Sequence, residues 1–465
     1  MVALVALGSL LTKALLEAPD PIEILSLSLP LGGGVFTWIL FLISLAQVPL
    51  ARPSAAAAFL VSVLAMAIYG VRRGWWRRAS GRPRPTEPRP PGIGLAPLIL
   101  ALCCALLLVS SALAVGRSYS RFDAMAGWSI KGYGIALEGS VEAADRWGTW
   151  GRAYPLNLPL QISLFWMFGG DELPGSKLLF PLTFLSLLAG VYGFWRTQGV
   201  GALLAGLGIL FLLTNPLAYL HSTLGVANLP FAAYLTLGSL WLSRGVFIDN
   251  ARHRWVGGTM LAIASWTRAE GIAYCLAILV GLWLSVRLLR AGRLSGPLWL
   301  VPLVAVTLSW FGFSLAGVAE SHLGSAMGGF FQRLLSGQFN ARYLGEIIRL
   351  YAIRGISPGN LGFLFPVLAL LLGSGLWRLR PRQDPLGAAL LGIAAIAAAV
   401  PVALFYVRSF TRWTDFTELL TRSFDRATLP AIFLTVAAAI LLLRDRRETE
   451  PDGPSRSASR DLAYP

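Results

Sequence analysis

The sequence predicts an all-α, polytopic integral membrane protein with about twelve transmembrane helices (11–13). Of its 465 residues, 55% are hydrophobic and only 13% are charged, whereas a soluble domain carries roughly 25% charge. The mean hydropathy is +0.65. Apolar runs of about 20 residues, each long enough to cross a bilayer as a helix, recur from end to end. These runs are continuous rather than alternating, which disfavours a transmembrane barrel.

The hydropathy pattern places twelve spans along the chain. They are expected at 26–49, 55–71, 95–116, 177–195, 199–219, 227–244, 256–268, 271–288, 297–318, 360–377, 386–406 and 428–443. A thirteenth candidate lies at 2–17, where Lys13, Glu17 and Asp20 weaken the pattern. The N-terminus makes a poor signal peptide, because no basic region precedes its apolar stretch and no clear cleavage site follows it.

The net charge of +16 is concentrated in a few basic groups. Seven arginines lie between Arg72 and Arg89, mixed with prolines, and predict an irregular linker at 72–94. The other basic groups are Arg244, Arg252 and Arg254; Arg287, Arg290 and Arg293; Arg378, Arg380 and Arg382; and Arg444, Arg446 and Arg447. With the spans above, all of them fall on one side, which the positive-inside rule makes cytoplasmic. We therefore expect a cell-membrane protein whose arginines are membrane anchors and not a nucleic-acid surface.

The opposite face carries charges of both signs. It comprises the segments 117–176, 319–359 and 407–427 and the turns near 220–226 and 268–271, and it holds twelve of the 23 acidic residues. Such a mixture indicates a site outside the cytoplasm for an anionic substrate, with acid–base chemistry. Within 319–359, Leu344, Ile347, Ile348 and Tyr351 recur at helical spacing. They predict an amphipathic helix at the membrane surface, either beside a lipid entry groove or as an interfacial brace.

Several enzyme classes lack their signatures. Cys103, Cys104 and Cys275 lie in apolar runs and suggest neither a disulfide framework nor a zinc site. Three scattered histidines disfavour a His-based metal cluster. There is no P-loop, dinucleotide fingerprint or nucleophile elbow. An enzyme acting outside the cytoplasm needs an activated substrate that comes through the membrane, and a lipid-linked phosphate is the natural form.

Four segments carry a family resemblance. They are RFDAMAGWSIKGYGI at 121–135, followed by Tyr154-Pro155-Leu156; VANLPFAAYLTLGSLWL at 226–242; WTRAEG at 266–271; and TRSFDRATLP at 421–430. In this order, over about 300 residues, they resemble integral membrane glycosyltransferases of the GT-C class. More narrowly, they resemble the protein mannosyltransferase and aminoarabinose transferase group (glycosyltransferase families 39 and 83). Asn228 stands where an aspartate is common in that group, and the region before residue 95 finds no match.

The resemblance implies a reaction. A sugar on a polyprenyl phosphate or pyrophosphate would pass to a hydroxyl of a glycan, lipid or protein, by inverting single displacement. Asp123 would be the general base or a metal-binding carboxylate; the alternative is that it caps the loop helix or pairs with Arg121 or Lys131. The group often carries a second acid next to the first. Here Ala124 stands there, which leaves Asp145 as the candidate and makes a divalent cofactor, Mg or Mn, an open question.

The same resemblance and the charge pattern nominate residues for donor binding. Lys131 lies eight positions after Asp123, on nearly the same helix face, and would contact phosphate or form an ion pair. The Arg268–Glu270 pair would bind the donor or be a structural ion pair. The Asp425–Arg426 pair would bind the donor phosphate or anchor the last span at the membrane interface. The last candidates are Arg152, Tyr154, as a sugar-stacking or packing ring, and His221, as a catalyst or a polar cap.

Two other function classes stay open. A polytopic transporter or flippase of lipid-linked sugars would show internal repeats and charges in mid-span, whereas the charges here cluster in outer loops. A non-catalytic protein with a transferase-like fold would explain the missing second acid. For the transferase, the expected organisation is membrane helices at 1–71, a basic cytoplasmic linker at 72–94, a GT-C-like catalytic domain at 95–444 and a polar cytoplasmic tail at 445–465.

Overall fold

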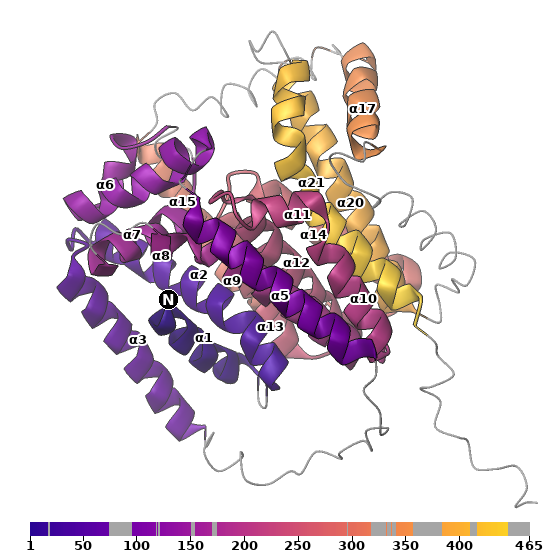
Figure 1. The fold of residues 1–465 in the computed structure, drawn as a ribbon, viewed down its shortest axis with the longest axis horizontal. Coiled ribbons are helices and arrows are strands. Elements are labelled where there is room, and N and C mark those ends of the chain that lie inside the picture. The colour runs from indigo at the N-terminus through magenta and orange to yellow at the C-terminus, as the bar shows by residue number, and fades with distance from the viewer. Residues whose placement is uncertain are drawn as a thin grey trace, which may run out of the picture.

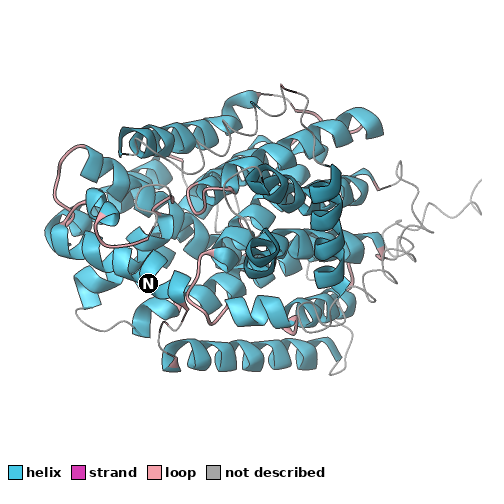
Figure 2. Ribbon diagram, turned by 90° about the horizontal axis from the view of Figure 1, so that it is seen from above, coloured by secondary structure: helices cyan, strands magenta, loops and turns pink. Residues whose placement is uncertain are grey.

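The computed structural model of the chain describes residues 1–16, 19–73, 95–117, 119, 121–149, 154–169, 174–294, 296–317, 332, 336, 341–356, 384–409 and 416–444. All regular structure within these ranges is helical (Figure 2). The predicted linker, the tail and most of the loop at 319–359 lie outside the described residues.

The helices follow one another along the chain with short connections. They are α1 (Val2–Leu15), α2 (Pro21–Leu45), α3 (Arg52–Arg72), α5 (Leu95–Gly116), η1 (Asp123–Ser129), α6 (Ile130–Glu138), η2 (Val141–Asp145), α7 (Asn157–Gly169), α8 (Pro174–Lys177), α9 (Leu179–Thr197), α10 (Ala202–Leu213), α11 (Pro216–His221), α12 (Asn228–Phe247), α13 (Ala251–Ser265), α14 (Gly271–Leu289), η4 (Pro297–Leu300), α15 (Val301–Gly317), α17 (Ala341–Ile356), α20 (Pro385–Ser409) and α21 (Phe416–Leu442).

The all-helical, multi-span class is confirmed. Each predicted span within the described residues overlaps one or two helices, and the span at 360–377 lies outside them. Seven described helices are long and apolar enough to cross a membrane, and three shorter apolar helices add to them. The span predicted at 199–219 is broken, because Pro216 starts a separate helix, α11, capped by the side chain of Asn215.

Helix α12 forms the centre of the bundle. This position explains why α12 is not among the seven helices that are long and apolar enough to cross a membrane. Nearly all of its residues are buried, and it packs against α13, α9, α21 and α20. A helix surrounded by protein can carry polar residues such as Thr236 and Ser239, which are fully buried. The long apolar helices α3 and α5 instead leave most of their length exposed at the periphery (Figure 1).

The first two helices form a close hairpin. A Cβ atom at Gly8 or Gly32 would overlap backbone of the other helix, so the two backbones touch where these glycines lie. The hydroxyls of Ser9 and Ser28 lie 2.8 Å apart across the same contact. Small residues that permit such approach are typical of helix pairs in membranes. Because α2 also packs on α9, α7 and α13, the hairpin belongs to the main bundle.

The bundle has two chemically different ends. At one end, Arg444 lies 3.4 Å from Asp384 and donates to the carbonyl of Gln198, and Arg254 pairs with Asp249. At the other end lie the loop segments η1, α6 and η2, and helix α17 (Figure 1). The backbone N–H of Leu50 donates to the carbonyl of Gly139, 2.7 Å away, and joins the α2–α3 connection to that loop. The antiparallel order of the helices thus separates the basic groups from the loop at 117–159, as the span assignment requires.

The amphipathic helix predicted within 319–359 is present as α17 (Ala341–Ile356). Ile347 is fully buried against Phe405 and Tyr406, and the ring of Tyr351 packs edge-on against Phe424, 5.0 Å between centroids. Ile348, predicted on the same face, is instead 51% exposed. The helix therefore packs on α20 and α21 along a narrower apolar stripe than predicted.

Candidate functional site

Arg268 is the centre of the candidate site. It lies in the turn between α13 and α14, and only 3% of its surface is exposed. Its Nε donates to Oε1 of Glu270 at 2.8 Å, and one Nη lies 2.5 Å from the same oxygen. The predicted Arg268–Glu270 pair is therefore present. Burial by itself lowers the pKa of Arg268, but Glu270, Tyr154 and Asp123 together hold it above its usual value, so the guanidinium stays charged.

A second arm of the site comes from the central helix. The other Nη of Arg268 donates to Oδ1 of Asn228, at the start of α12. This contact fixes the orientation of the amide, so that Nδ2 of Asn228 faces Nδ1 of His221 at 3.3 Å. Since Nδ2 can only donate, Nδ1 of His221 is the acceptor and its ring proton is on Nε2. His221 is thus linked to Arg268 through one side chain.

The loop at 117–159 supplies the third arm. Asp123 begins η1, which is a π-helix, a rare form that is often found at functional sites. Asp123 is half-buried and close enough to Arg268 to contribute to its raised pKa. Tyr154 acts on Arg268 in the same way, and its ring packs edge-on against Trp128, 5.7 Å between centroids. The structure therefore brings Asp123, Tyr154 and Glu270 around the buried guanidinium of Arg268, and His221 is linked to it through Asn228.

A buried hydrogen-bond network ties these arms together. Asn157, fully buried at the start of α7, accepts at Oδ1 from Thr37 (2.7 Å) and Gln161 (2.9 Å). Its Nδ2 donates to Oγ1 of Thr267 at 2.8 Å, and its backbone N–H donates to the carbonyl of Trp266 at 3.3 Å. Gln161 reaches further to the hydroxyl of Tyr234 on α12, at 3.3 Å. Asn157 thereby joins the loop that ends in Tyr154 to the turn that carries Arg268.

The C-terminal helices close the site from the remaining direction. The hydroxyl of Tyr274, one turn after Glu270, donates to the carbonyl of Ala427 on α21 at 2.6 Å, and Glu270 and Tyr351 lie within its electrostatic range. The backbone of Arg426 therefore runs next to the site. The side chains of Asp425 and Arg426, and Arg152 as a whole, lie outside the described residues, so their proposed donor contacts stay predictions.

Lys131 lies near the start of α6, directly after the π-helix that begins at Asp123. It is fully buried, and its aliphatic chain lies on the backbone of Gly148. Burial lowers its pKa to about 8, and the charge of Asp145 opposes that shift. Of the two predicted roles, the neighbouring Asp145 favours the ion pair. Asp145 itself is exposed at the end of η2.

Among the described residues, no three His, Cys, Asp or Glu side chains lie close enough to hold an ion. Glu270 is held by Arg268, and Asn228 offers an amide where the related group often has a carboxylate. A divalent cofactor, Mg or Mn, next to Asp123 therefore stays a prediction.

The sequence alone did not point to Asn157, Gln161 or Tyr274. Each lies inside an apolar stretch, and no local pattern marks Tyr274. A polar residue at membrane depth is nevertheless costly unless it is paired, and the amide pair at 157 and 161, one helical turn apart, is such a signal.

Comparisons with known proteins were made on sequence and on fold. No family model matches the chain, and no curated protein matches it in sequence. Among solved structures, it is similar to the crystal structure of ArnT from Cupriavidus metallidurans bound to undecaprenyl phosphate, with 19% identity and a TM-score of 0.39, over 75% of this chain and 77% of that one.

Proposed function

We propose that the chain is a membrane glycosyltransferase. It would transfer a sugar from a polyprenyl-phosphate or pyrophosphate donor to a hydroxyl on a glycan, lipid or protein acceptor, at the extracytoplasmic face. The observation that carries the proposal is the convergence of Asp123, Tyr154, Asn228 and Glu270 on the buried guanidinium of Arg268. These residues belong to three of the four segments that resemble GT-C transferases.

The buried cation suits a phosphate leaving group. Glu270 and Asn228 hold the guanidinium charged and fixed in orientation, so binding of the donor needs little reorganisation. The fork of donors matches two phosphate oxygens better than a lysine does. The turn between α13 and α14 would thereby stabilise the charge that develops on the phosphate as the sugar leaves.

Asp123 supplies the base in this scheme. Its carboxylate takes the proton of the acceptor hydroxyl as the oxygen forms a bond to the anomeric carbon. The bond from that carbon to the phosphate oxygen breaks, and the lipid phosphate leaves with the electron pair. Attack from the face opposite the leaving group inverts the anomeric centre, and the step needs no second carboxylate.

Apolar residues next to Asp123 support a lipid-linked donor. Phe122 and Met125 are 61% and 54% exposed on the same segment. Large exposed apolar side chains next to a half-buried carboxylate are expected where a polyprenyl chain enters from the bilayer. The acidic and apolar sides of η1 would then contact the acceptor and the lipid, respectively.

The test is sugar transfer by the purified full chain from polyprenyl-phosphate-linked sugars. Asp123→Asn should lower the rate of sugar transfer at least about 100-fold, because general-base catalysis typically contributes 10²–10⁴-fold. Arg268→Gln should weaken donor binding as well. Glu142→Gln, which changes an exposed acid of the same loop, should leave transfer unchanged.

Each outcome separates the function classes. Loss of transfer in Asp123→Asn with normal expression supports the enzyme, whereas unchanged transfer removes Asp123 from the base role. Movement of labelled lipid-linked sugar across vesicles without any covalent product would identify a flippase instead. Absence of both activities in the wild-type chain would favour a non-catalytic protein.

A further inference from the structure

Lys177 is a buried cation at the end of the bundle that carries the loop at 117–159. It is the last residue of α8, directly before α9, and only 6% of its surface is exposed. Helix α9 runs from there to the basic end, where the carbonyl of Gln198 accepts from Arg444. A lysine at the start of a membrane-spanning helix buries its aliphatic chain and directs its ammonium to the headgroup region. Lys177 is thus placed at the depth of the lipid headgroups.

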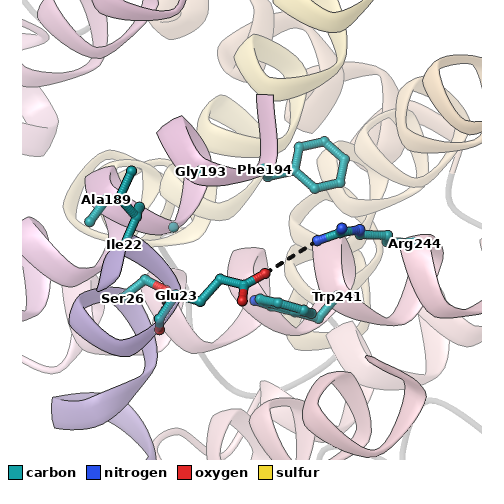
Figure 3. Close-up of a pocket in the computed structure, with 9 residues that line it drawn as sticks. Ile22, Glu23, Ser26, Ala189, Gly193, Phe194, Trp241 and Arg244 are labelled. Atoms are coloured by element: carbon teal, nitrogen blue, oxygen red, sulfur yellow. Dashed lines mark hydrogen bonds and ion pairs between the residues drawn. The ribbon is translucent and has the colours of Figure 1, made fainter. Parts of the chain in front are cut away.

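Lys177 lacks the acidic neighbour that other buried cations of the chain have. Arg268 is paired with Glu270, and at the opposite end of the bundle Arg244 lies 3.6 Å from Glu23 (Figure 3). Among the described residues, the one polar contact of the Lys177 ammonium is with a ring, that of Tyr119, whose centroid lies 5.1 Å from Nζ. A buried ammonium costs free energy unless it is paired and hydrogen-bonded. An anion bound next to Lys177 would therefore stabilise this arrangement.

The ring of Tyr119 holds the ammonium in a fixed position. The hydroxyl of Tyr119 lies 2.8 Å from that of Ser176. The ring also packs on Gly225, where an added Cβ atom would come within 2.5 Å of it. Gly225 has a φ of +74°, a conformation that favours glycine, so the backbone can stay this close to the ring. A cation–π contact covers one side of an ammonium and leaves N–H donors for a ligand. The site is therefore preorganised for a group that accepts hydrogen bonds.

The surroundings of Lys177 favour an amphiphile over a small ion. Tyr119 lies just after α5, which packs on α8 and leaves most of its apolar length exposed. Phe165 of α7 lies next to Gly175 of α8, and Phe168, one turn further along α7, is 54% exposed. Exposed apolar side chains beside a cation are expected where hydrocarbon chains and a headgroup meet. The start of α9 also favours a negative charge.

We propose that Lys177 binds the phosphate of an anionic phospholipid, from the leaflet next to the loop at 117–159. The ammonium donates to the phosphate oxygens, and the acyl chains lie along the exposed surface of α5. Because Lys177 has no acid beside it in the described part of the chain, an anionic headgroup fits better than a zwitterionic one. The site is separate from Arg268 and does not depend on the function proposed for the candidate active site. Since Tyr119 precedes Asp123 by four residues, the bound lipid would hold the connection between α5 and η1 in place.

The test is the melting temperature of the full chain, freed of lipid in a non-ionic detergent, with and without phosphatidylglycerol. The lipid should raise the wild-type melting temperature, and Lys177→Met should lose at least about half of this rise, because a ligand stabilises only the state that binds it. Without lipid, Lys177→Met should be at least as stable as the wild type, since methionine keeps an apolar chain and removes the unpaired charge. Lys13→Met is the matched control, because it removes one exposed positive charge from α1 and should keep the full rise.

A measurement on the wild type keeps the proposal testable if Lys177→Met does not fold. Acetic anhydride should acetylate Lys177 several-fold more slowly in phosphatidylglycerol than in diacylglycerol, which lacks the phosphate, while Lys13 reacts equally in both; peptide mass spectrometry reads each site. Equal acetylation of Lys177 in the two lipids, or an equal rise in melting temperature for the wild type and Lys177→Met, would overturn the proposal. So would the same rise with inorganic phosphate alone, which would indicate a soluble ligand. A lipid-free Lys177→Met less stable than the wild type would indicate a counter-charge within the chain and also overturn it.

Discussion

At the scale of single residues, the charge of Arg268 is maintained by its immediate neighbours. A buried guanidinium is stable only when hydrogen bonds and an opposite charge replace water. Glu270 supplies the charge, and Asn228 supplies a neutral acceptor. A second carboxylate in place of Asn228 would compete with a phosphate for Arg268. The amide at this position therefore leaves the cation able to accept an anionic ligand.

Lys131 offers a prediction about pH. Its pKa is lowered to about 8 in the folded chain, chiefly by burial, whereas an unfolded lysine titrates near pH 10.4. Between about pH 8 and 10.4 the unfolded state binds more protons, so the free energy of unfolding should rise with pH, by up to about 1.4 kcal/mol per pH unit. Below pH 8 both states are protonated, and the buried charge destabilises the fold.

Thermal unfolding in detergent between pH 7 and 10 checks this dependence. The wild-type melting temperature should increase over that range relative to Lys131→Met, and the variant should be the more stable protein at pH 7. Lys13→Met is the control, because Lys13 is exposed on α1 and its replacement should leave the pH dependence intact. A wild-type curve parallel to that of Lys131→Met would show that Lys131 keeps an ordinary pKa.

At the scale of elements, the hydrogen bonds of Asn157 hold the end of the loop at 117–159 against the turn between α13 and α14. Asn157→Ala removes the bonds to Thr37, Gln161 and Thr267 at once. Both threonines keep a backbone acceptor in their own helical segment, so the expected loss of stability is only about 1–2 kcal/mol. Sugar transfer should fall about tenfold, through a raised donor KM, because Tyr154 and Arg268 are no longer held together.

The matched control is Ser163→Ala, on the same helix. Among the described residues, the Ser163 hydroxyl bonds only within α7, to the carbonyl of Leu160 at 2.8 Å, so its loss should not affect the donor KM. Asn157→Ala and Arg268→Lys should also be non-additive, since the first is expected to act through the second. Fully additive effects on KM would show that Asn157 contributes stability and not position.

The α1–α2 hairpin gives a prediction about packing. Gly8→Ala should lower the melting temperature markedly, because the added methyl group overlaps the carbonyl of Ser28 and the helices must move apart. Gly312→Ala, in the interior of α15, meets nothing within 4 Å and should be neutral or slightly stabilising. Equal melting temperatures for the two variants would contradict the close approach of α1 and α2.

The sequence predicted helices and membrane spans well and their irregularities poorly. Long apolar runs such as 95–116 are recognisable because a lipid-exposed helix needs continuous apolar surface. The π-helix at Asp123–Ser129 and the burial of Lys131 depend on how the loop folds on α7, which involves residues far apart in the sequence. Motif resemblance identified Asp123, Arg268 and Asn228, whereas Asn157 and Tyr274 became visible only through their partners.

At the scale of the whole molecule, the separation of charge between the two ends makes the orientation testable. The loop that carries Asp123 lies at the end opposite Arg444, Arg254 and Arg244. The positive-inside rule then predicts that Asp123 lies outside the cytoplasm. Single cysteines introduced by Glu142→Cys, in the loop, and Arg287→Cys, at the basic end, would report the two sides, since both positions are exposed.

The background for this labelling should carry Cys104→Ser, because Cys104 is exposed on α5, while Cys103 and Cys275 are buried. A membrane-impermeant maleimide added to intact cells should label position 142, and position 287 only after permeabilisation. The reverse pattern would place the arginine-rich end outside and contradict transfer on the extracytoplasmic face. If position 142 is labelled from outside, a lipid-linked donor made inside the cell must cross the membrane before it reaches Arg268. The labelling result thus determines whether the proposed enzyme depends on a separate flippase.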